Sequence, residues 1–217
     1  MQKSEIFKRY LTVIIGAFFM GLGVALTKLA ELGVSTISSV PNVMSIKFTF
    51  MTMGNWLTVW NCILILGQVL ILKKEFKPIQ LLQIAVSVIF GYFTDLGMLI
   101  FGGIPTGAYI SKLLMSVMGV AVLGFGISLT VIADTVMNPG EAFVKVIADK
   151  LHTDFGNTKI AFDFFCVAMA AVMSLCFFDF TLVGIREGTL IAAIGTGTVV
   201  KLCCKVLRKP VEKFFVK

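Results

Sequence analysis

Two pairs of side chains, each a hydroxyl followed four residues later by a carboxylate, are the best candidates for a polar binding site in this chain. Thr27 precedes Glu31, and Thr130 precedes Asp134. Residues four apart share one face of a helix, so each pair presents its two polar groups together. Such groups suit a cation or a neutral polar solute, and we expect each pair to line a vestibule that leads to a central site. The alternative is that both acids only mark where a helix meets water.

Four further polar residues complete the predicted solute site. Asn61 and Asp163 lie about 9 Å inside apolar stretches, at about 1.5 Å per helical residue. Polar side chains at such depth usually face a bundle interior or a cavity, although Asp163 could instead snorkel to the membrane interface. Ser38 and Ser39 belong to a hydroxyl cluster just before Pro41. This order predicts the first turn of a short helix, capped by one of the two serines.

The sequence contains no arrangement of side chains that predicts catalysis. His152 is the single histidine, and one histidine does not form a metal site by itself. The five cysteines lack the spacing of metal ligands. Phosphate-binding and dinucleotide-binding motifs are missing as well. We therefore expect a protein that is not an enzyme and that has no cofactor, no metal and no nucleic-acid partner.

The two candidate pairs belong to a segment that occurs twice. Residues 16–31 read GAFFMGLGVALTKLAE, and residues 119–134 read GVAVLGFGISLTVIAD. At a spacing of 103 positions, six of the sixteen residues are identical, and three of the six are glycines. Two random apolar stretches rarely agree to this extent. The pattern indicates an internal duplication.

The composition indicates a polytopic membrane protein. Apolar residues make up 58% of the 217 residues, charged residues make up only 14%, and the mean hydropathy is +0.96. Soluble proteins contain about 25% charged residues, and a membrane-spanning helix needs about 20 largely apolar residues. Six stretches meet this requirement. They are Tyr10–Leu29, Trp56–Leu72, Ile79–Ile100, Tyr109–Ala133, Ile160–Leu182 and Gly188–Leu207.

The positive charges predict the orientation of these spans. Four of the nineteen Lys and Arg residues fall on one side of the predicted spans, and the other fifteen fall on the side of both termini. The four are Lys28, Lys47, Lys112 and Arg186. Lys and Arg accumulate on the cytoplasmic side of membrane proteins, so we expect both termini in the cytoplasm of a bacterial cell. The net charge of +7 then reflects topology and anionic lipid headgroups.

The duplication extends to the other spans and determines their relative direction. Gly54 recurs as Gly156 at a spacing of 102, and Gly91 corresponds to Gly195 at a spacing of 104. Each copy contains three spans, an odd number, so the second copy starts from the opposite side of the membrane. The predicted fold is an all-α integral membrane protein with six transmembrane helices in two inverted-topology three-helix repeats.

The two repeats form one membrane domain, with the first in residues 1–104 and the second in residues 105–217. The linker 31–54 is apolar and lies outside the cell, whereas the linker 134–159 predicts an amphipathic helix at the cytoplasmic interface. The predicted apolar face of this helix consists of Phe143, Val146, Ile147 and Leu151. Its polar face consists of Glu141, Lys145, Asp149 and His152.

Four motifs rich in glycine and hydroxyl residues point to one group of bacterial membrane proteins. They are GLGVAL at 21–26, LGVSTISSVPNVMS at 32–45, GNW at 54–56 and GIREGTLIAAIGTG at 184–197. In these motifs the chain resembles the YitT/YczE-type (YczE/YyaS/YitT) integral membrane proteins, along nearly its whole length. The resemblance implies six spans in the inner membrane, and it implies no catalytic residues.

Inverted repeats are how many transporters build two related gates around one site. We therefore expect a secondary transporter or facilitator of a small polar or cationic solute across the bacterial inner membrane. The expected partners are the lipid bilayer and an unidentified solute, with a homodimer as an open alternative to a monomer. Two other functions stay open, namely a structural or regulatory membrane protein without transport and the substrate-binding subunit of an energy-coupling-factor importer.

Overall fold

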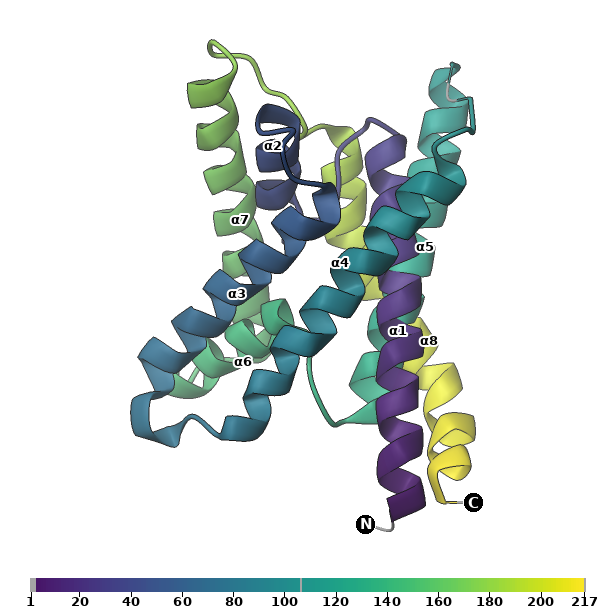
Figure 1. Cartoon of the computed structure of the whole chain (residues 1–217), viewed down its shortest axis with the longest axis vertical. Coiled ribbons are helices and arrows are strands. Elements are labelled where there is room, and N and C mark those ends of the chain that lie inside the picture. The colour runs from purple at the N-terminus through teal and green to yellow at the C-terminus, as the bar shows by residue number, and fades with distance from the viewer. Residues whose placement is uncertain (1–2, 106, 217) are drawn as a thin grey trace.

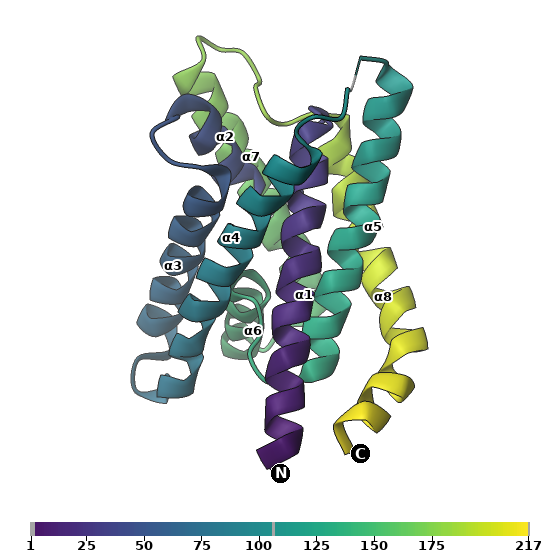
Figure 2. The same ribbon diagram turned by 45° about the vertical axis from the view of Figure 1, so that its right-hand side comes forward.

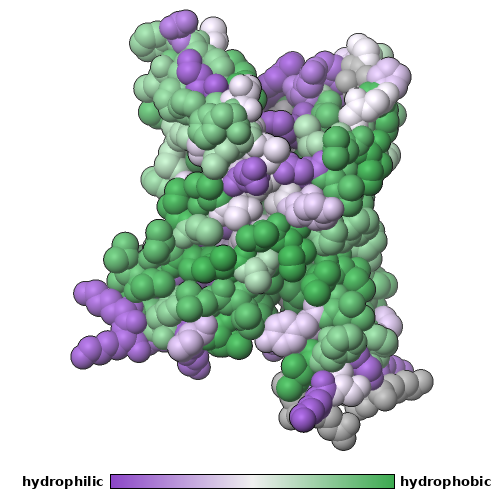
Figure 3. Space-filling model, in the orientation of Figure 1, coloured by the Kyte–Doolittle hydropathy of each residue, from purple (hydrophilic) through white to green (hydrophobic). Residues whose placement is uncertain are grey.

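The computed structural model describes residues 3–105 and 107–216, and this part of the chain is helical without strands (Figure 1). Six helices are long and apolar enough to cross a membrane. Figure 3 shows an apolar belt between more hydrophilic ends. The predicted all-α class and membrane-spanning character are confirmed. The long helices are α1 (Lys3–Leu29), α3 (Met53–Leu72), α4 (Leu82–Phe101), α5 (Tyr109–Ala133), α7 (Phe155–Phe177) and α8 (Glu187–Val216).

Four shorter elements connect the long helices. Both chain termini lie at the same end of the molecule, here called the termini end, and the opposite end is called the distal end (Figure 1). The connecting elements are α2 (Ser39–Lys47), α6 (Pro139–Leu151) and the short 3₁₀ turns η1 (Lys73–Glu75) and η2 (Pro78–Leu81).

Helices α1 and α5 form the centre of the molecule. Helix α1 packs along both α4 and α5, and α5 in turn packs along α8 (Figure 2). In the most apolar stretch of each helix, 61% of α1 and 61% of α5 is buried inside the molecule, whereas only 6% of α8 is buried. The remaining long helices therefore lie at the periphery, and their exposed apolar side chains suit contact with lipid.

The short helices α2 and α6 both pack against α3 and α7, α2 near the distal end and α6 near the termini end (Figure 1). The helix predicted in the second linker exists, but its buried side is different from the predicted apolar face. Val144 is fully buried, whereas Leu151 is 66% exposed. The reason is that α6 is enclosed by protein on two sides, so that its burial does not follow a single apolar stripe.

The last two long helices differ from their predicted bounds. Helix α7 ends at Phe177 because Asp179 and Phe180 have left-handed backbone angles, with φ of 48° and 62°. The apolar residues up to Leu182 belong to the following loop. Helix α8 continues past Pro210, and its Phe215 is buried against α1 and α5. An apolar pattern alone does not distinguish a helix from an apolar loop beyond a turn.

Candidate functional site

The contact between α1 and α5 uses the duplicated glycines in a reciprocal way. A Cβ atom on Gly16 would lie 2.7 Å from Cγ2 of Thr130, and a Cβ atom on Gly119 would lie 2.7 Å from Cγ2 of Thr27. Corresponding residues thus exchange roles across one contact. The duplicated glycines thus allow the two helices to approach each other closely. The other glycines of this contact are Gly23 and Gly126.

Two of the predicted site residues, Thr27 and Thr130, contribute to this packing. The hydroxyl of Thr27 donates a hydrogen bond to the carbonyl of Val24 at 2.9 Å, and the hydroxyl of Thr130 donates to the carbonyl of Ile127 at 2.8 Å. Each hydroxyl therefore bonds its own helix, and each methyl group fills the space over a glycine. Both side chains are buried.

The two predicted carboxylates lie at opposite ends of the molecule. Glu31 follows α1 at the distal end, is exposed and forms an ion pair with Lys112 of α5. Asp134 ends α5 with a left-handed φ of 46° and is also exposed. Its neighbour Thr135 lines a cavity at the termini end. The structure does not bring Glu31 and Asp134 together.

The predicted serines are buried beside the first turn of α2. Ser38 precedes the helix without a capping hydrogen bond, and its hydroxyl accepts a hydrogen bond from Ser35 at 2.8 Å. Ser39 donates to the carbonyl of Thr36 at 2.5 Å. These bonds stabilise the turn between α1 and α2.

Asn61 of α3 and Asp163 of α7, which correspond in the duplication, have different surroundings. Asn61 is 2% exposed, and its Nδ2 has no hydrogen-bond partner in the part of the chain that the structure describes. Asp163 is half-buried and accepts hydrogen bonds from Lys159, one turn earlier, at 2.5 and 2.6 Å. Among the predicted site residues, Asn61 therefore has a buried amide group that can donate a further hydrogen bond.

A lysine near the distal end of α1 joins that helix to α2. The ammonium group of Lys28 donates to Oδ1 of Asn42 at 2.9 Å and to Oγ of Ser45 at 2.6 Å. Asn42 is fixed in turn, because its Nδ2 donates to the carbonyl of Gly184 at 2.9 Å. Lys28 is half-buried, so its charge depends on these neutral oxygen atoms for solvation.

An aspartate of α4 holds the first turn of α3 at the same end. Asp95 accepts a hydrogen bond from the backbone amide of Gly54 at 2.8 Å and another from the hydroxyl of Thr52 at 2.6 Å. A carboxylate is favourable here because the first amides of a helix lack partners within the helix. We define the distal cluster by its five side chains. They are Lys28, Asn42, Ser45, Thr52 and Asp95.

The distal cluster lies where α1, α2, α3 and α4 come together at the distal end. Figure 3 shows a notch between the two arms of the molecule at this end, with hydrophilic residues inside it. Lys28 and Asp95 are both half-buried, and Thr52 is exposed. The cluster therefore combines a positive and a negative group that are both partly shielded from water.

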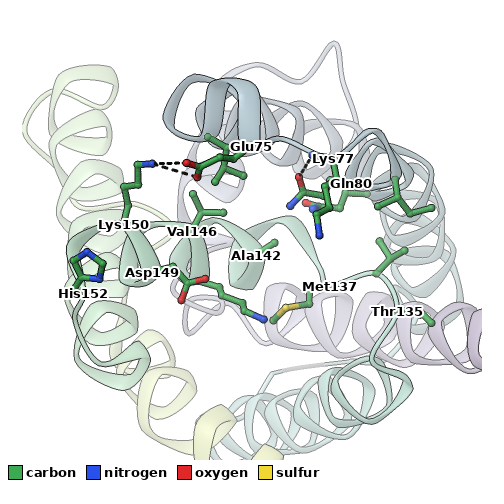
Figure 4. Close-up of a pocket in the computed structure, with 15 residues that line it drawn as sticks. Glu75, Lys77, Gln80, Thr135, Met137, Ala142, Val146, Asp149, Lys150 and His152 are labelled. Carbon is green, nitrogen blue, oxygen red and sulfur yellow. Dashed lines mark hydrogen bonds and ion pairs between the residues drawn. The ribbon is translucent and has the colours of Figure 1, made fainter.

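A cavity of about 750 Å³ opens at the termini end, among α3, α4, α6 and the segment after α5. Its rim is charged, and an ion pair of 3.3 Å joins Lys150 to Glu75 across it (Figure 4). Asp149 and His152 line the same cavity. The rim carries both signs of charge and therefore does not select for one sign.

A pair of glutamine amides lies on the wall of this cavity. Gln83 lines the cavity and exchanges two hydrogen bonds with the buried Gln68, at 3.0 and 3.2 Å. Gln68 also lies 3.4 Å from the carbonyl of Pro139, which begins α6. This pair links α3, α4 and α6 beside the cavity.

Within residues 3–105 and 107–216, no group of three or more His, Cys, Asp and Glu side chains could hold a metal ion. The geometry of the site suits the binding of a polar solute between helices.

The fold and the site define a multi-pass helical membrane protein with polar groups at both ends of a glycine-packed centre. The chain belongs to the family of unknown function DUF6198, whose family model matches residues 7–205. No curated protein and no solved structure gives a significant match. The resemblance to YitT/YczE-type proteins stays a prediction.

Sequence reasoning missed the main residues of the distal cluster. In the sequence, Lys28 indicates only the orientation of the spans, and Asn42 belongs to the linker 31–54. Asp95 gave a signal, because it is the acid set most deeply in an apolar stretch. The contact between Lys28 and Asn42 depends on how α2 folds back onto α1, which no local pattern in the sequence expresses.

Proposed function

We propose that the protein transports or facilitates the passage of a small polar solute across the bacterial inner membrane, through two inverted three-helix repeats that exchange conformations. The observation that carries this proposal is a glycine contact formed in one half of the chain and open in the other. The corresponding glycines are present in both halves.

The formed contact joins α3 to α4. A Cβ atom on Gly54 would lie 2.0 Å from the carbonyl oxygen of Gly91, and a Cβ atom on Gly91 would lie 2.5 Å from the carbonyl oxygen of Gly54. The corresponding residues of α7 and α8, Gly156 and Gly195, do not touch each other. A Cβ atom on Gly195 would meet only a side chain of α5. Helix α3 packs along α4, whereas α7 has no comparable packing with α8.

The packing around the central helices supports an inverted repeat. Besides the reciprocal contact of α1 with α5, Gly21 of α1 approaches Phe93 and Thr94 of α4, and its counterpart Gly124 of α5 approaches Val199 and Thr196 of α8. Helices α2 and α6 lie in corresponding places, each against α3 and α7. A two-fold relation between the halves accounts for all of these contacts.

Transport would follow if the halves exchanged their packing. Helix α7 would then close onto α8 through Gly156 and Gly195, and α3 would separate from α4. Because α3 begins at the distal end and α7 begins at the termini end, the exchange would alternately loosen the two ends of the molecule (Figure 1). This is how inverted repeats produce alternating access around one site.

The test is uptake by proteoliposomes, with a substitution that only the second conformation would oppose. The vesicles are incubated with a mixture of small metabolites, and their contents are analysed by mass spectrometry. A Cβ atom on Gly156 would meet only Oδ2 of Asp154, which caps α7, so Gly156→Leu should lower the melting temperature only slightly. Uptake should nevertheless be lost, because the leucine blocks closure of α7 onto α8.

Gly197→Leu is the matched control, since a Cβ atom at this position would have nothing within 4 Å. It should preserve both folding and uptake. If no metabolite enters vesicles that contain the wild-type protein, the transport proposal is wrong. If Gly156→Leu transports as the wild type does, the exchange of conformations is wrong.

A further inference from the structure

Lys28 and Asp95 carry opposite charges in the distal cluster without forming an ion pair. Their charged atoms are not within 4 Å of each other. They belong to neighbouring contacts, because Ser45, which accepts from Lys28, lies 3.6 Å from Sδ of Met53, the residue between Thr52 and Gly54 that both donate to Asp95. Both charged residues are half-buried, where opposite charges normally pair or bind a third group. Each is held instead by neutral groups on separate helices.

Both charged groups retain unused hydrogen-bonding capacity. An ammonium group has three donors, and Lys28 uses two of them, on Asn42 and Ser45. A carboxylate offers about four acceptor positions, and Asp95 uses two, for Gly54 and Thr52. One further acceptor group on Lys28 and one further donor group on Asp95 can therefore be accommodated.

The two charges are also held in place before any solute arrives. Asn42, which accepts from Lys28, is itself fixed to Gly184. Asp95 is fixed by the amide of Gly54, where α3 meets α4 through glycine. Groups that are ordered in advance lose little entropy on binding, so such a site favours a solute that matches both charges at once.

We infer that the distal cluster binds a small zwitterion of the amino-acid type, with its carboxylate on Lys28 and its ammonium group on Asp95. This inference rests on the proposed function and specifies its substrate class. A simple anion bound at Lys28 would bring a negative charge close to Asp95. A simple cation bound at Asp95 would bring a positive charge close to Lys28. The site therefore discriminates against both by repulsion.

The test measures the melting temperature of the detergent-solubilised protein with individual L-amino acids, and with propionate and ethylamine. These two compounds retain the carboxylate or the ammonium group of alanine without the other. At least one amino acid should raise the melting temperature with saturating dependence on concentration. Propionate and ethylamine should give no shift at the same concentrations.

Two charge-neutralising substitutions assign the effect to the cluster. Lys28→Gln and Asp95→Asn should each weaken the apparent affinity for that amino acid about 10- to 100-fold, the loss of one charge-assisted hydrogen bond. Lys47→Gln and Asp179→Asn remove the same charges from exposed residues at the same end, and the affinity should stay unchanged. The backbone of Asp179 is left-handed, which Asn tolerates.

Three results would overturn the inference. They are equal stabilisation by propionate or ethylamine, unchanged affinity in Lys28→Gln and Asp95→Asn, and no response to any amino acid. Uptake of a different solute by proteoliposomes, combined with no response to amino acids, would refute the zwitterion and leave the transport proposal standing. Binding of an amino acid without uptake of any solute would support the site and refute transport.

Discussion

Helices α3 and α4 in the first half of the chain are packed together, whereas α7 and α8 in the second half stand apart. The two pairs carry glycines at corresponding positions, yet only Gly54 and Gly91 are in contact. In Figure 1 α3 and α4 lie side by side, and α7 and α8 have no comparable arrangement. The difference shows that one sequence pattern occurs in two packing arrangements within one molecule.

The central helices do not share this difference. The contact between α1 and α5 is reciprocal, with Gly16 against Thr130 and Gly119 against Thr27. The difference between α3–α4 and α7–α8 therefore surrounds a central contact that is reciprocal. A molecule built in this way can change the periphery without disturbing its most buried helices.

The largest expected effect comes from adding one methyl group to each half. Gly54→Ala places a Cβ atom 2.0 Å from a backbone oxygen, which cannot move away by rotation. We expect a loss of about 3 kcal/mol in the free energy of unfolding. Gly156→Ala meets only Oδ2 of Asp154, at 2.9 Å, and should cost at most about 1 kcal/mol, because this oxygen accepts the N-cap bond from Asn157. Unfolding in detergent measures both, and equal losses would remove the distinction between the halves.

A smaller effect is expected from the glutamine pair that joins α3 to α4 beside the cavity. Gln68→Leu leaves the buried amide of Gln83 without its partner, at a cost of about 2 kcal/mol. Replacing both glutamines by leucine should recover about half of this loss, because no amide is then left unsatisfied. A double variant less stable than the single variant would contradict this account. Unfolding in detergent measures both variants.

The smallest effects are expected at the corresponding residues Asn61 and Asp163. Asn61→Leu removes an amide whose Nδ2 is buried without a partner, and we expect a gain of about 1 kcal/mol in stability. Asp163→Asn breaks a half-buried pair with Lys159 and should cost less than about 0.5 kcal/mol. Thermal unfolding measures both variants. A large loss in Asn61→Leu would show that Nδ2 has a bonding partner after all, such as an ordered water.

The sequence predicts the helices and the central contact because both depend on local patterns. Apolar stretches of sufficient length become the six long helices, and the spacing of Gly16, Gly23, Gly119 and Gly126 makes the close approach of α1 and α5 possible. Pro41 likewise lies in the first turn of a short helix, as predicted. The central contact also joins distant segments, but the duplication marks its glycines in the sequence.

The distal cluster was not predictable in the same way, because its bonds join residues of different helices. Lys28 meets Asn42 only after α2 folds back onto α1, and Asp95 meets Gly54 only because α3 crosses α4 through glycines. The side chains of Thr27 and Thr130 pack between α1 and α5, and their hydroxyls donate within their own helices. A helix offers a hydroxyl its own carbonyl as partner, and both threonines use it.

The exchange of packing between the halves is tested most directly by distances between spin labels in lipid nanodiscs. One pair joins α3 to α4 (Asn55→Cys with Tyr92→Cys), and the other joins α7 to α8 (Asn157→Cys with Gly197→Cys). Both are placed in a variant without the native cysteines. The perturbation is Gly91→Val, which opposes the contact with Gly54.

In the parent protein, the account predicts a short distance between α3 and α4 and a long one between α7 and α8. Gly91→Val should lengthen the first distance and shorten the second, because α7 then closes onto α8. If the first distance lengthens while the second stays unchanged, the two halves do not exchange conformations.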